Sequence, residues 1–386
     1  MKLKRLFSAA VALSLAIVLA TGCGGNNNNN DVIKIGLNYE FSGGNSSYGQ
    51  SSVDGIKMAI DEINAAGGVN GKQIELVRRD NKSEAAEALS IATDLMTRQG
   101  VVAVLGPATS APFKNTIPAA TQYQIPVLSG SATADDVTVD ASGVKEFAFR
   151  ICFSDLYQGT AMANYASRNL SASKAVIIMD SSSDYAKGLA SSFRDTFKAN
   201  GGEIVTEEAY VAKDTDFNAI LTSIKAKSFD VIFLPGYYEE AGLIIKQARD
   251  MGIDQPILGA DGFDAPELRD LAGDSALNKV YFVNHYSSLD QDPLVLNFIN
   301  DFNSEYGKDP NAFQALGYDM GYFLADAIKR AGSEDPVAIK DAMAATKNFS
   351  GITGTFSIDE NHNAIKSAVV IEYIDGVPAS SERVGS

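Results

Sequence analysis

The sequence has very few of the residues that support redox or metal chemistry. It contains two cysteines, two histidines and no tryptophan in 386 residues. Cys23 follows an N-terminal apolar run that predicts a secretory signal. Cys152 therefore has no partner, and no disulfide framework is possible. His285 and His362 are far apart and lack metal-ligand spacing, and we expect neither a metal site nor a cofactor. The formal net charge of −16 argues against nucleic acid or an anionic membrane surface as a partner.

The motifs of common enzyme classes are also absent. The segment GGVNGKQ at 67–73 resembles a phosphate loop, but its glycines are too close together and Gln73 stands where Ser or Thr would hold magnesium. No G-x-S-x-G surrounds a serine, and no G-x-G-x-x-G follows the first strand. Ser110, in LGPATSAPF, has no evident base. The sequence therefore disfavours an enzyme and favours a binding protein.

A long apolar run occurs only at the start of the chain, over 6–19. Basic residues precede it, and Ala20, Thr21, Gly22 and Cys23 follow it. This pattern predicts a secretory signal over 1–22. Small residues ending at a cysteine resemble a bacterial lipoprotein signal, in which Cys23 becomes the lipidated first residue. We expect 23–30 to be a flexible tether and the protein to be extracytoplasmic and lipid-anchored; a plain secreted protein is the alternative.

The body of the chain alternates strand and helix patterns. Segments such as VIKIGLNY, VVAVLG and KAVIIMD are apolar strands of the kind that parallel sheets bury on both faces. Between them, apolar residues recur every three or four positions, as at Val53, Ile56 and Ile60. The alternation runs twice, before and after residue 150. It predicts an α/β fold of two doubly wound parallel-sheet lobes.

The last hundred residues break this alternation. They predict helices at about 292–307, 310–331 and 335–346, and then an antiparallel hairpin of 351–359 with 367–376. Strand-like segments near 149–153, 281–285 and 352–356 are expected to cross between the lobes as a hinge. We therefore predict a first lobe of 31–150 plus 285–352, and a second lobe of 151–284 plus 353–386.

Polar loops are expected where strands of the first lobe end, which is where open α/β sheets bind ligands. GPATSAP and SGSATAD are rich in Gly, Ser and Thr and carry no charge before Asp135. Ser110 is predicted to cap the next helix, whose free N–H groups would attract an anion. Ser110 and Thr133 could together bind one carboxylate; alternatively, both merely cap helices.

The strand ends of the second lobe have a different chemistry. Tyr185 and Tyr237 are predicted to cover the cleft as flat apolar walls with a polar edge. Asp261 is a lone carboxylate at a strand end and could pair with an ammonium group. The alternatives are ordinary packing for the tyrosines and an Asp-Gly turn for Asp261. A hydroxyl-rich half facing an acidic, aromatic half describes a receptor for a small zwitterion.

The set of segments GPATS, SGSAT, SSDYAKGLA, PGYYEEA and ILGADGF resembles, in order, the periplasmic leucine/isoleucine/valine-binding proteins, over about 31–375. The resemblance implies the type I periplasmic binding protein fold. It implies that Tyr48 closes over the ligand and that Ala108 and Ser131 offer main-chain groups. It also implies that Ser110 binds the α-carboxylate, that Thr133 contacts carboxylate and amine, and that Asp261 replaces the more usual Glu.

The resemblance further implies a monomeric solute-binding lipoprotein that captures branched-chain amino acids by lobe closure. Its partners would be an ABC permease and the ATPase subunits of that importer. Three alternatives stay open: the same fold binding another neutral amino acid, an amide or a small aromatic acid; a sensory module; and an enzyme.

Overall fold

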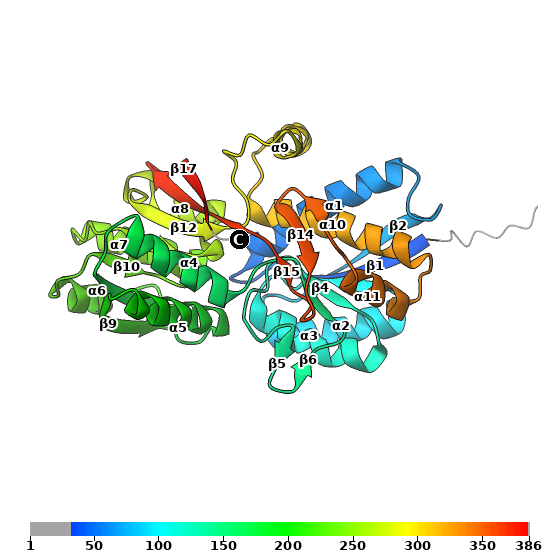
Figure 1. The fold of residues 1–386 in the computed structure, drawn as a ribbon, viewed down its shortest axis with the longest axis horizontal. Helices are drawn as coiled ribbons and strands as arrows, with labels where there is room; N and C mark the ends of the chain where they lie inside the picture. Colours follow the sequence, from blue (N-terminus) through cyan, green and yellow to red (C-terminus); the bar gives the residue numbers. More distant parts are fainter. Residues whose placement is uncertain (1–31, 385–386) are drawn as a thin grey trace, which may run out of the picture. The chain divides into compact units, whose positions relative to one another are not determined.

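The computed structural model describes residues 32–384. The predicted signal, Cys23 and the tether lie outside the described residues. Within the described part of the chain, no helix combines the length and apolarity needed to cross a bilayer. The strands form two large sheets, one in each of two lobes, together with a three-stranded sheet and a short hairpin (Figure 1).

The first lobe is built on a five-stranded sheet in the order β2-β1-β3-β4-β7, in which every pair is parallel. Its strands are β1 (Val32–Tyr39), β2 (Gln73–Asp80), β3 (Ala103–Leu105), β4 (Val127–Ser129) and β7 (Ala148–Arg150). Its helices are α1 (Ser46–Ala65), α2 (Ala85–Asp94), α3 (Ser110–Tyr123), α9 (Pro293–Tyr306), α10 (Ala312–Ala331) and α11 (Pro336–Ala344). A π-helical turn, η1 (Leu95–Gln99), extends α2, and β5 (Val139–Asp140) pairs with β6 (Gly143–Val144).

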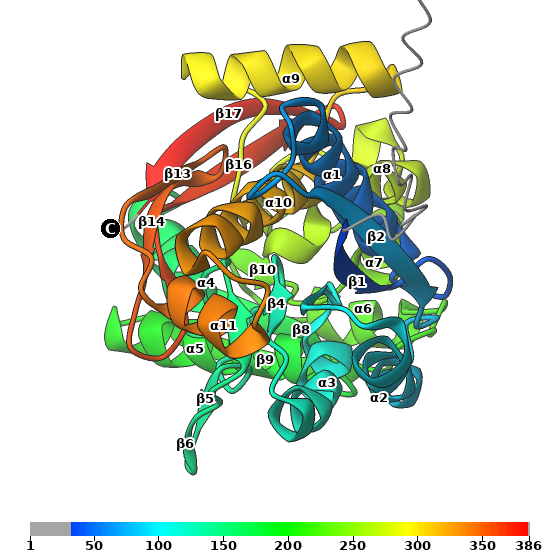
Figure 2. The same cartoon turned by 90° about the vertical axis from the view of Figure 1, so that its right-hand side faces the viewer.

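Successive side chains along the strands of this sheet point to opposite faces and pack into two separate cores. Leu105 of β3 and Leu128 of β4 pack toward α1 and α10, which lie side by side (Figure 2). Their neighbours Val104 and Val127 pack toward α2 and α3 on the other face. Burial on both faces is why these strands are continuously apolar in sequence.

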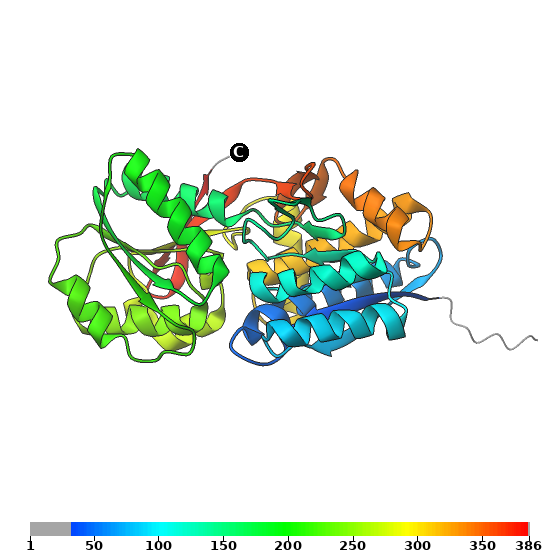
Figure 3. The same cartoon turned by 90° about the horizontal axis from the view of Figure 1, so that it is seen from below.

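The second lobe holds a seven-stranded sheet in the order β17-β16-β12-β11-β10-β8-β9, with helices on both faces (Figure 3). The strands from β9 to β12 are parallel, and β16 and β17 add an antiparallel edge. They are β8 (Lys174–Asp180), β9 (Glu203–Tyr210), β10 (Val231–Phe233), β11 (Ile257–Gly259), β12 (Val280–Asn284), β16 (Ala368–Ile374) and β17 (Val377–Val384). The helices are α4 (Asp155–Arg168), α5 (Asp184–Ala199), α6 (Asn218–Lys225), α7 (Tyr238–Asp250), η2 (Asp261–Phe263), α8 (Pro266–Ala272) and η3 (Asp274–Ala276).

The predicted fold class is confirmed, but the predicted hairpin of 351–359 with 367–376 is wrong. Strand β14 (Gly354–Ile358) instead pairs with β13 (Phe349–Gly351) and β15 (Ala364–Ile365). Strand β16 pairs with β12 and β17 in the other sheet. Strand β14 reads GTFSI and strand β16 reads AVVIEYI, and neither pattern specifies which neighbour the strand pairs with.

The chain passes between the two large sheets three times. The passages lie between β7 and α4, between β12 and α9, and between β15 and β16 (Figure 1). The third passage comes later than the expected 352–356. Phe356 of β14 packs against Phe323 of α10, and Asn363 bridges to Arg150 of β7. Residues 353–365 therefore lie with the first lobe, whereas the sequence assigned them to the second.

Candidate functional site

Three loops of the first lobe meet beyond the carboxyl ends of β1, β3 and β4. The carboxylate of Glu40, the residue after β1, accepts hydrogen bonds from the N–H groups of Ala108 (3.0 Å) and Thr109 (3.1 Å), and from the Thr109 hydroxyl (2.7 Å). Glu40 is fully buried, and burial raises the pKa of its carboxyl against the lowering effect of these hydrogen bonds. Glu40 thus fixes the loop that leads into α3.

The helix α3 begins at Ser110, but Ser110 does not cap it, and this prediction is wrong. The N-cap residue is Thr109, whose hydroxyl is bound to Glu40. Because Ser110 is the first helical residue, its N–H and that of Ala111 have no acceptor within the helix. The Ser110 hydroxyl accepts a hydrogen bond from the N–H of Ala134 at 3.1 Å. Ser110 therefore joins the two loops and leaves its O–H proton and helix-start N–H groups for an anion.

The loop after β4 is held by hydrogen bonds from several directions. The Ser131 hydroxyl donates to the carbonyl of Ala108 at 2.9 Å. The guanidinium of Arg150 donates to the carbonyls of Thr133 (2.8 Å) and Ala134 (2.9 Å). The Thr133 side chain is 1% exposed. The fold thus places Ser131 and Thr133 on a rigid loop beside Ser110.

In the second lobe, Asp261 follows β11 and lies against the start of α5. The Tyr185 hydroxyl donates to the Asp261 carboxylate at 2.8 Å and accepts from the N–H of Gly262 at 3.0 Å. The Tyr185 and Tyr237 rings are stacked, with centroids 5.0 Å apart and an interplanar angle of 1°. The acid is 3% exposed, so it is withdrawn from water beside two flat aromatic faces.

His285, which the sequence left without a function, contacts the same carboxylate. Its Nε2 lies 3.1 Å from Asp261 Oδ2, and its ring stacks on Phe153 with centroids 3.7 Å apart. Burial lowers the pKa of His285 to about 4, although the hydrogen bond to Asp261 raises it. The imidazole is therefore neutral near pH 7, and it can donate a hydrogen bond to Asp261 without neutralising the charge of the acid.

Tyr48, on the first turn of α1, contacts the second lobe directly. Its hydroxyl donates to the carbonyl of Gly262 at 2.6 Å and accepts from the N–H of Tyr238 at 3.1 Å. Its ring stacks on Phe313 of α10, with centroids 4.4 Å apart. Tyr48 therefore links the two lobes through two hydrogen bonds.

The structure brings most of the predicted site residues to one small cavity. Its lining includes Tyr48, Ala108, Ser110, Ser131, Tyr185, Tyr237 and Asp261, together with Thr109, Gly262 and Phe313. Thr133 is buried but is not among the lining residues. Ser110 and Asp261, from opposite lobes, therefore share one cavity.

Some residues of this region could not be found from sequence. Phe313 is the second residue of α10, a helix that is apolar over most of its length. Glu40 and His285 lie in segments without a recognisable motif, and their partners are distant in sequence. The one available signal was the position of Glu40 directly after a strand, where polar residues of open α/β sheets gather.

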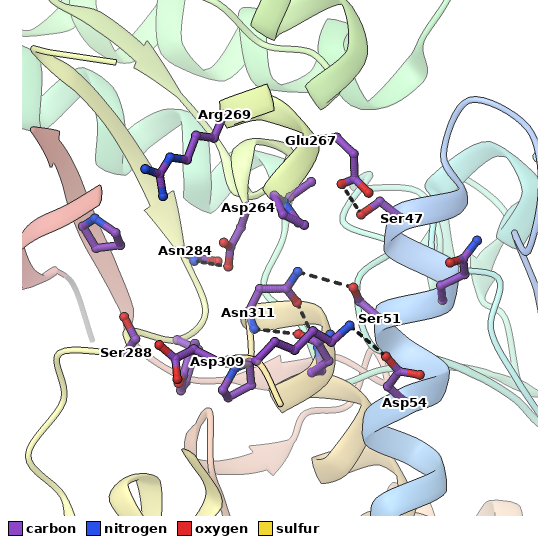
Figure 4. A pocket seen from close by; sticks show the side chains of 18 of the residues that line it. Ser47, Ser51, Asp54, Asp264, Glu267, Arg269, Asn284, Ser288, Asp309 and Asn311 are labelled. Atoms are coloured by element: carbon purple, nitrogen blue, oxygen red, sulfur yellow. Dashed lines mark hydrogen bonds and ion pairs between the residues drawn. The ribbon is translucent and has the colours of Figure 1, made fainter. Parts of the chain in front are cut away.

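A second, larger cleft is lined by polar residues of both lobes, among them Ser47, Asp264 and Glu267 (Figure 4). The Ser47 hydroxyl donates to Glu267 at 2.5 Å, and the Asp264 carboxylate accepts from the N–H of Ala312 at 2.7 Å. These bonds join the two lobes. Most polar groups of the cleft form hydrogen bonds or ion pairs with one another. We therefore interpret the cleft as part of the interface between the lobes.

Comparison with known proteins places this arrangement among binding proteins. The family described as periplasmic binding protein matches residues 32–377. A branched-chain amino acid transporter substrate-binding protein of Streptococcus pneumoniae, solved in complex with isoleucine, is 44% identical with a TM-score of 0.87, covering 92% of this chain and 99% of that one. A leucine-binding protein of Thermotoga maritima is 35% identical with a TM-score of 0.84, covering 92% and 98% of the two chains. The Leu/Ile/Val-binding protein homolog 1 of Brucella abortus is 30% identical, covering 92% of each sequence.

Proposed function

Because the chain belongs to the periplasmic binding protein family, we propose that it is the substrate-binding component of an ABC importer and that it captures leucine, isoleucine or valine. One observation carries the proposal: Ser110 of the first lobe and Asp261 of the second line the same cavity. The names of the similar proteins support the choice of ligand class.

The two sides of the cavity match the two charged ends of an amino acid. The Ser110 hydroxyl and the first N–H groups of α3 bind the α-carboxylate, with the positive end of the helix dipole behind them. Asp261 accepts from the ammonium group, in a site where exclusion of water strengthens the pair. The aliphatic side chain packs against Tyr185, Tyr237 and Phe313.

The fold lets ligand binding drive lobe closure. The ligand binds first to the loops of the first lobe, and closure then brings Asp261 and the tyrosines onto it. Closure stabilised by the ligand selects the shape that a permease and its ATPase subunits recognise. We propose further that the protein acts as a monomer outside the cytoplasm, anchored by a lipid on Cys23, which lies outside the described residues.

Changing Tyr48 to phenylalanine is expected to weaken amino-acid binding by about tenfold, because two hydrogen bonds that form only between closed lobes are removed. The ring and its stacking on Phe313 remain. Stopped-flow fluorescence should show a faster dissociation rate with little change in association. Tyr123→Phe serves as the control, because Tyr123 ends α3 away from the cavity lining. Equal dissociation rates for Tyr48→Phe and the wild type would contradict this role.

A thermal-shift panel of the twenty amino acids tests the proposed ligand class. At about 100 times the dissociation constant, a ligand that binds only the folded protein adds about 2.7 kcal/mol of stability. We expect leucine, isoleucine or valine to raise the unfolding temperature most, and charged amino acids to have no effect. If a different neutral amino acid or an amide alone raised it, the fold would stand and the ligand class would be wrong.

A further inference from the structure

An ion pair joins the two lobes outside the ligand cavity. Lys114 lies on α3 of the first lobe, and Asp184 is the first residue of α5 in the second lobe. The Nζ of Lys114 and the Oδ2 of Asp184 are 2.7 Å apart. Neither residue is part of the cavity lining. The pair therefore connects the lobes without forming a wall of the ligand site.

Each member of this pair lies beside a residue that does line the cavity. Lys114 follows Ser110 by four positions on α3, so the two side chains lie on one face of the helix, a turn apart. Asp184 directly precedes Tyr185. Ser110 and Tyr185 line the cavity from opposite lobes. Moving the lobes apart to open the cavity must therefore separate Lys114 from Asp184.

Lys114 also has an acidic partner within its own lobe. Its Nζ lies 3.1 Å from Oδ1 and 3.0 Å from Oδ2 of Asp136. The ammonium group of Lys145 donates to the main-chain carbonyl of Asp136 and so holds that acid in place. Because these contacts lie within the first lobe, they do not depend on closure. Lys114 therefore keeps one acidic partner when the lobes separate and gains a second when they close.

Asp184 can carry its charge with the lobes closed or apart. It begins α5, where the helix dipole favours an anion. Its side chain is 50% exposed, so water solvates it when Lys114 moves away. In the closed form, the hydrogen bond from Lys114 lowers the pKa of Asp184. Burial lowers the pKa of Lys114, but the hydrogen bonds to Asp184 and Asp136 outweigh this effect and raise it. Both groups are therefore charged near pH 7.

Most surface ion pairs contribute little, because two flexible side chains must be fixed and salt screens their attraction. The Lys114 side chain differs from this case, since it is only 20% exposed. Its two hydrogen bonds to Asp136 already fix the ammonium group. Less conformational entropy is therefore lost when Asp184 joins, and more of the attraction is left to stabilise closure.

We propose that Lys114 and Asp184 form an ionic latch that closes with the lobes and slows the release of the ligand. The latch stabilises the closed form and makes no contact with the cavity, so it sets the dissociation rate and not the choice of ligand. The inference rests on the proposed function, and it deepens it by assigning control of ligand release to residues outside the cavity.

Stopped-flow tyrosine fluorescence with leucine, at about 20 and about 500 mM NaCl, tests the latch. At low salt, Asp184→Asn is expected to release leucine about three- to fivefold faster than the wild type. High salt should speed release from the wild type by a similar factor and have little effect on the variant, whose latch charge is already absent. Asp195→Asn is the matched control, because Asp195 is an exposed acid further along α5, and it should behave as the wild type.

Lys114→Met provides a second test, in which the effect of Asp184→Asn changes sign. Asp136 and Asp184 both lie within 3.1 Å of the Lys114 nitrogen, so without the ammonium group they repel each other across the lobes. Lys114→Met should therefore release leucine faster than Asp184→Asn. Adding Asp184→Asn to Lys114→Met should slow release again. If the double variant released leucine faster than Lys114→Met, the latch would be overturned.

The outcomes separate the latch from the proposed function. Equal dissociation rates of leucine from the wild type and Asp184→Asn at low salt would overturn the latch and leave the proposed function standing. If the wild type bound no amino acid, the proposed function would be wrong and the latch, which rests on it, would be wrong as well. Should Asp184→Asn fail to fold, an unchanged dissociation rate in Lys114→Met would overturn the latch by itself.

Discussion

Replacing Asp261 by alanine is expected to weaken leucine binding by about 100-fold or more. Removing one partner of a buried, hydrogen-bonded charge pair costs about 2–5 kcal/mol, because the other charge then stays unpaired. Asp261 is 3% exposed and accepts a hydrogen bond from Tyr185. The alanine variant therefore also leaves the Tyr185 hydroxyl and His285 without their acceptor.

Asp261→Asn separates the charge from the hydrogen bonds. Its amide oxygen can still accept from Tyr185, so the cavity should keep its shape while it loses the negative charge. Calorimetry should show that most of the affinity for leucine is lost in this variant as well. Binding of 4-methylpentanoate, the analogue of leucine without the amino group, should improve because the Asp261 carboxylate that repels it is gone. Asp254→Ala, an exposed acid of the same lobe, is the control. Equal leucine affinity in Asp261→Asn and wild type would remove the ammonium assignment.

The sequence predicted the location of Asp261 because it obeys a general rule of parallel sheets. A short apolar strand followed by an acid and a glycine places that acid at the carboxyl edge of the sheet, where ligands bind. Ser110 follows from the same rule after β3. The positions of Asp261 and Ser110 depend on local sequence pattern and strand direction, so they could be predicted from a single sequence.

The contacts of His285 and Asp155 could not be predicted in this way. His285 meets Asp261 only because the passage from β12 to α9 runs past the end of β11. The N–H of Asp155, the first residue of α4, donates to the carbonyl of Thr133 because the first passage between the sheets is short. Both contacts are set by how the chain crosses between lobes, which apolar periodicity does not encode. The misplaced hairpin has the same origin, since the partners of β14 and β16 are chosen by tertiary packing and not by the pattern of either strand.

Arg150 is a further residue that the sequence did not mark, and replacing it by methionine is expected to lower the free energy of unfolding by about 3 kcal/mol or more. The side chain is 3% exposed, and its Nε also donates to Asn363 at 2.6 Å. Methionine retains much of the apolar volume but cannot donate to the Thr133 and Ala134 carbonyls. Buried acceptors that lose a charged donor bear most of this cost.

The effect of Arg150→Met should extend to binding, because the loop that it releases carries Ser131 and Thr133. Urea denaturation measures the stability, and calorimetry on the still-folded variant measures the affinity for leucine. Arg150→Lys restores a charge but not the fork of donors, so it should recover only part of the stability. Arg98→Met is the control, because Arg98 is exposed and its ion pair with Asp94 is a surface contact at 3.7 Å. An unchanged urea midpoint in Arg150→Met would mean that the loop holds its shape through Ser110 and Ser131 alone.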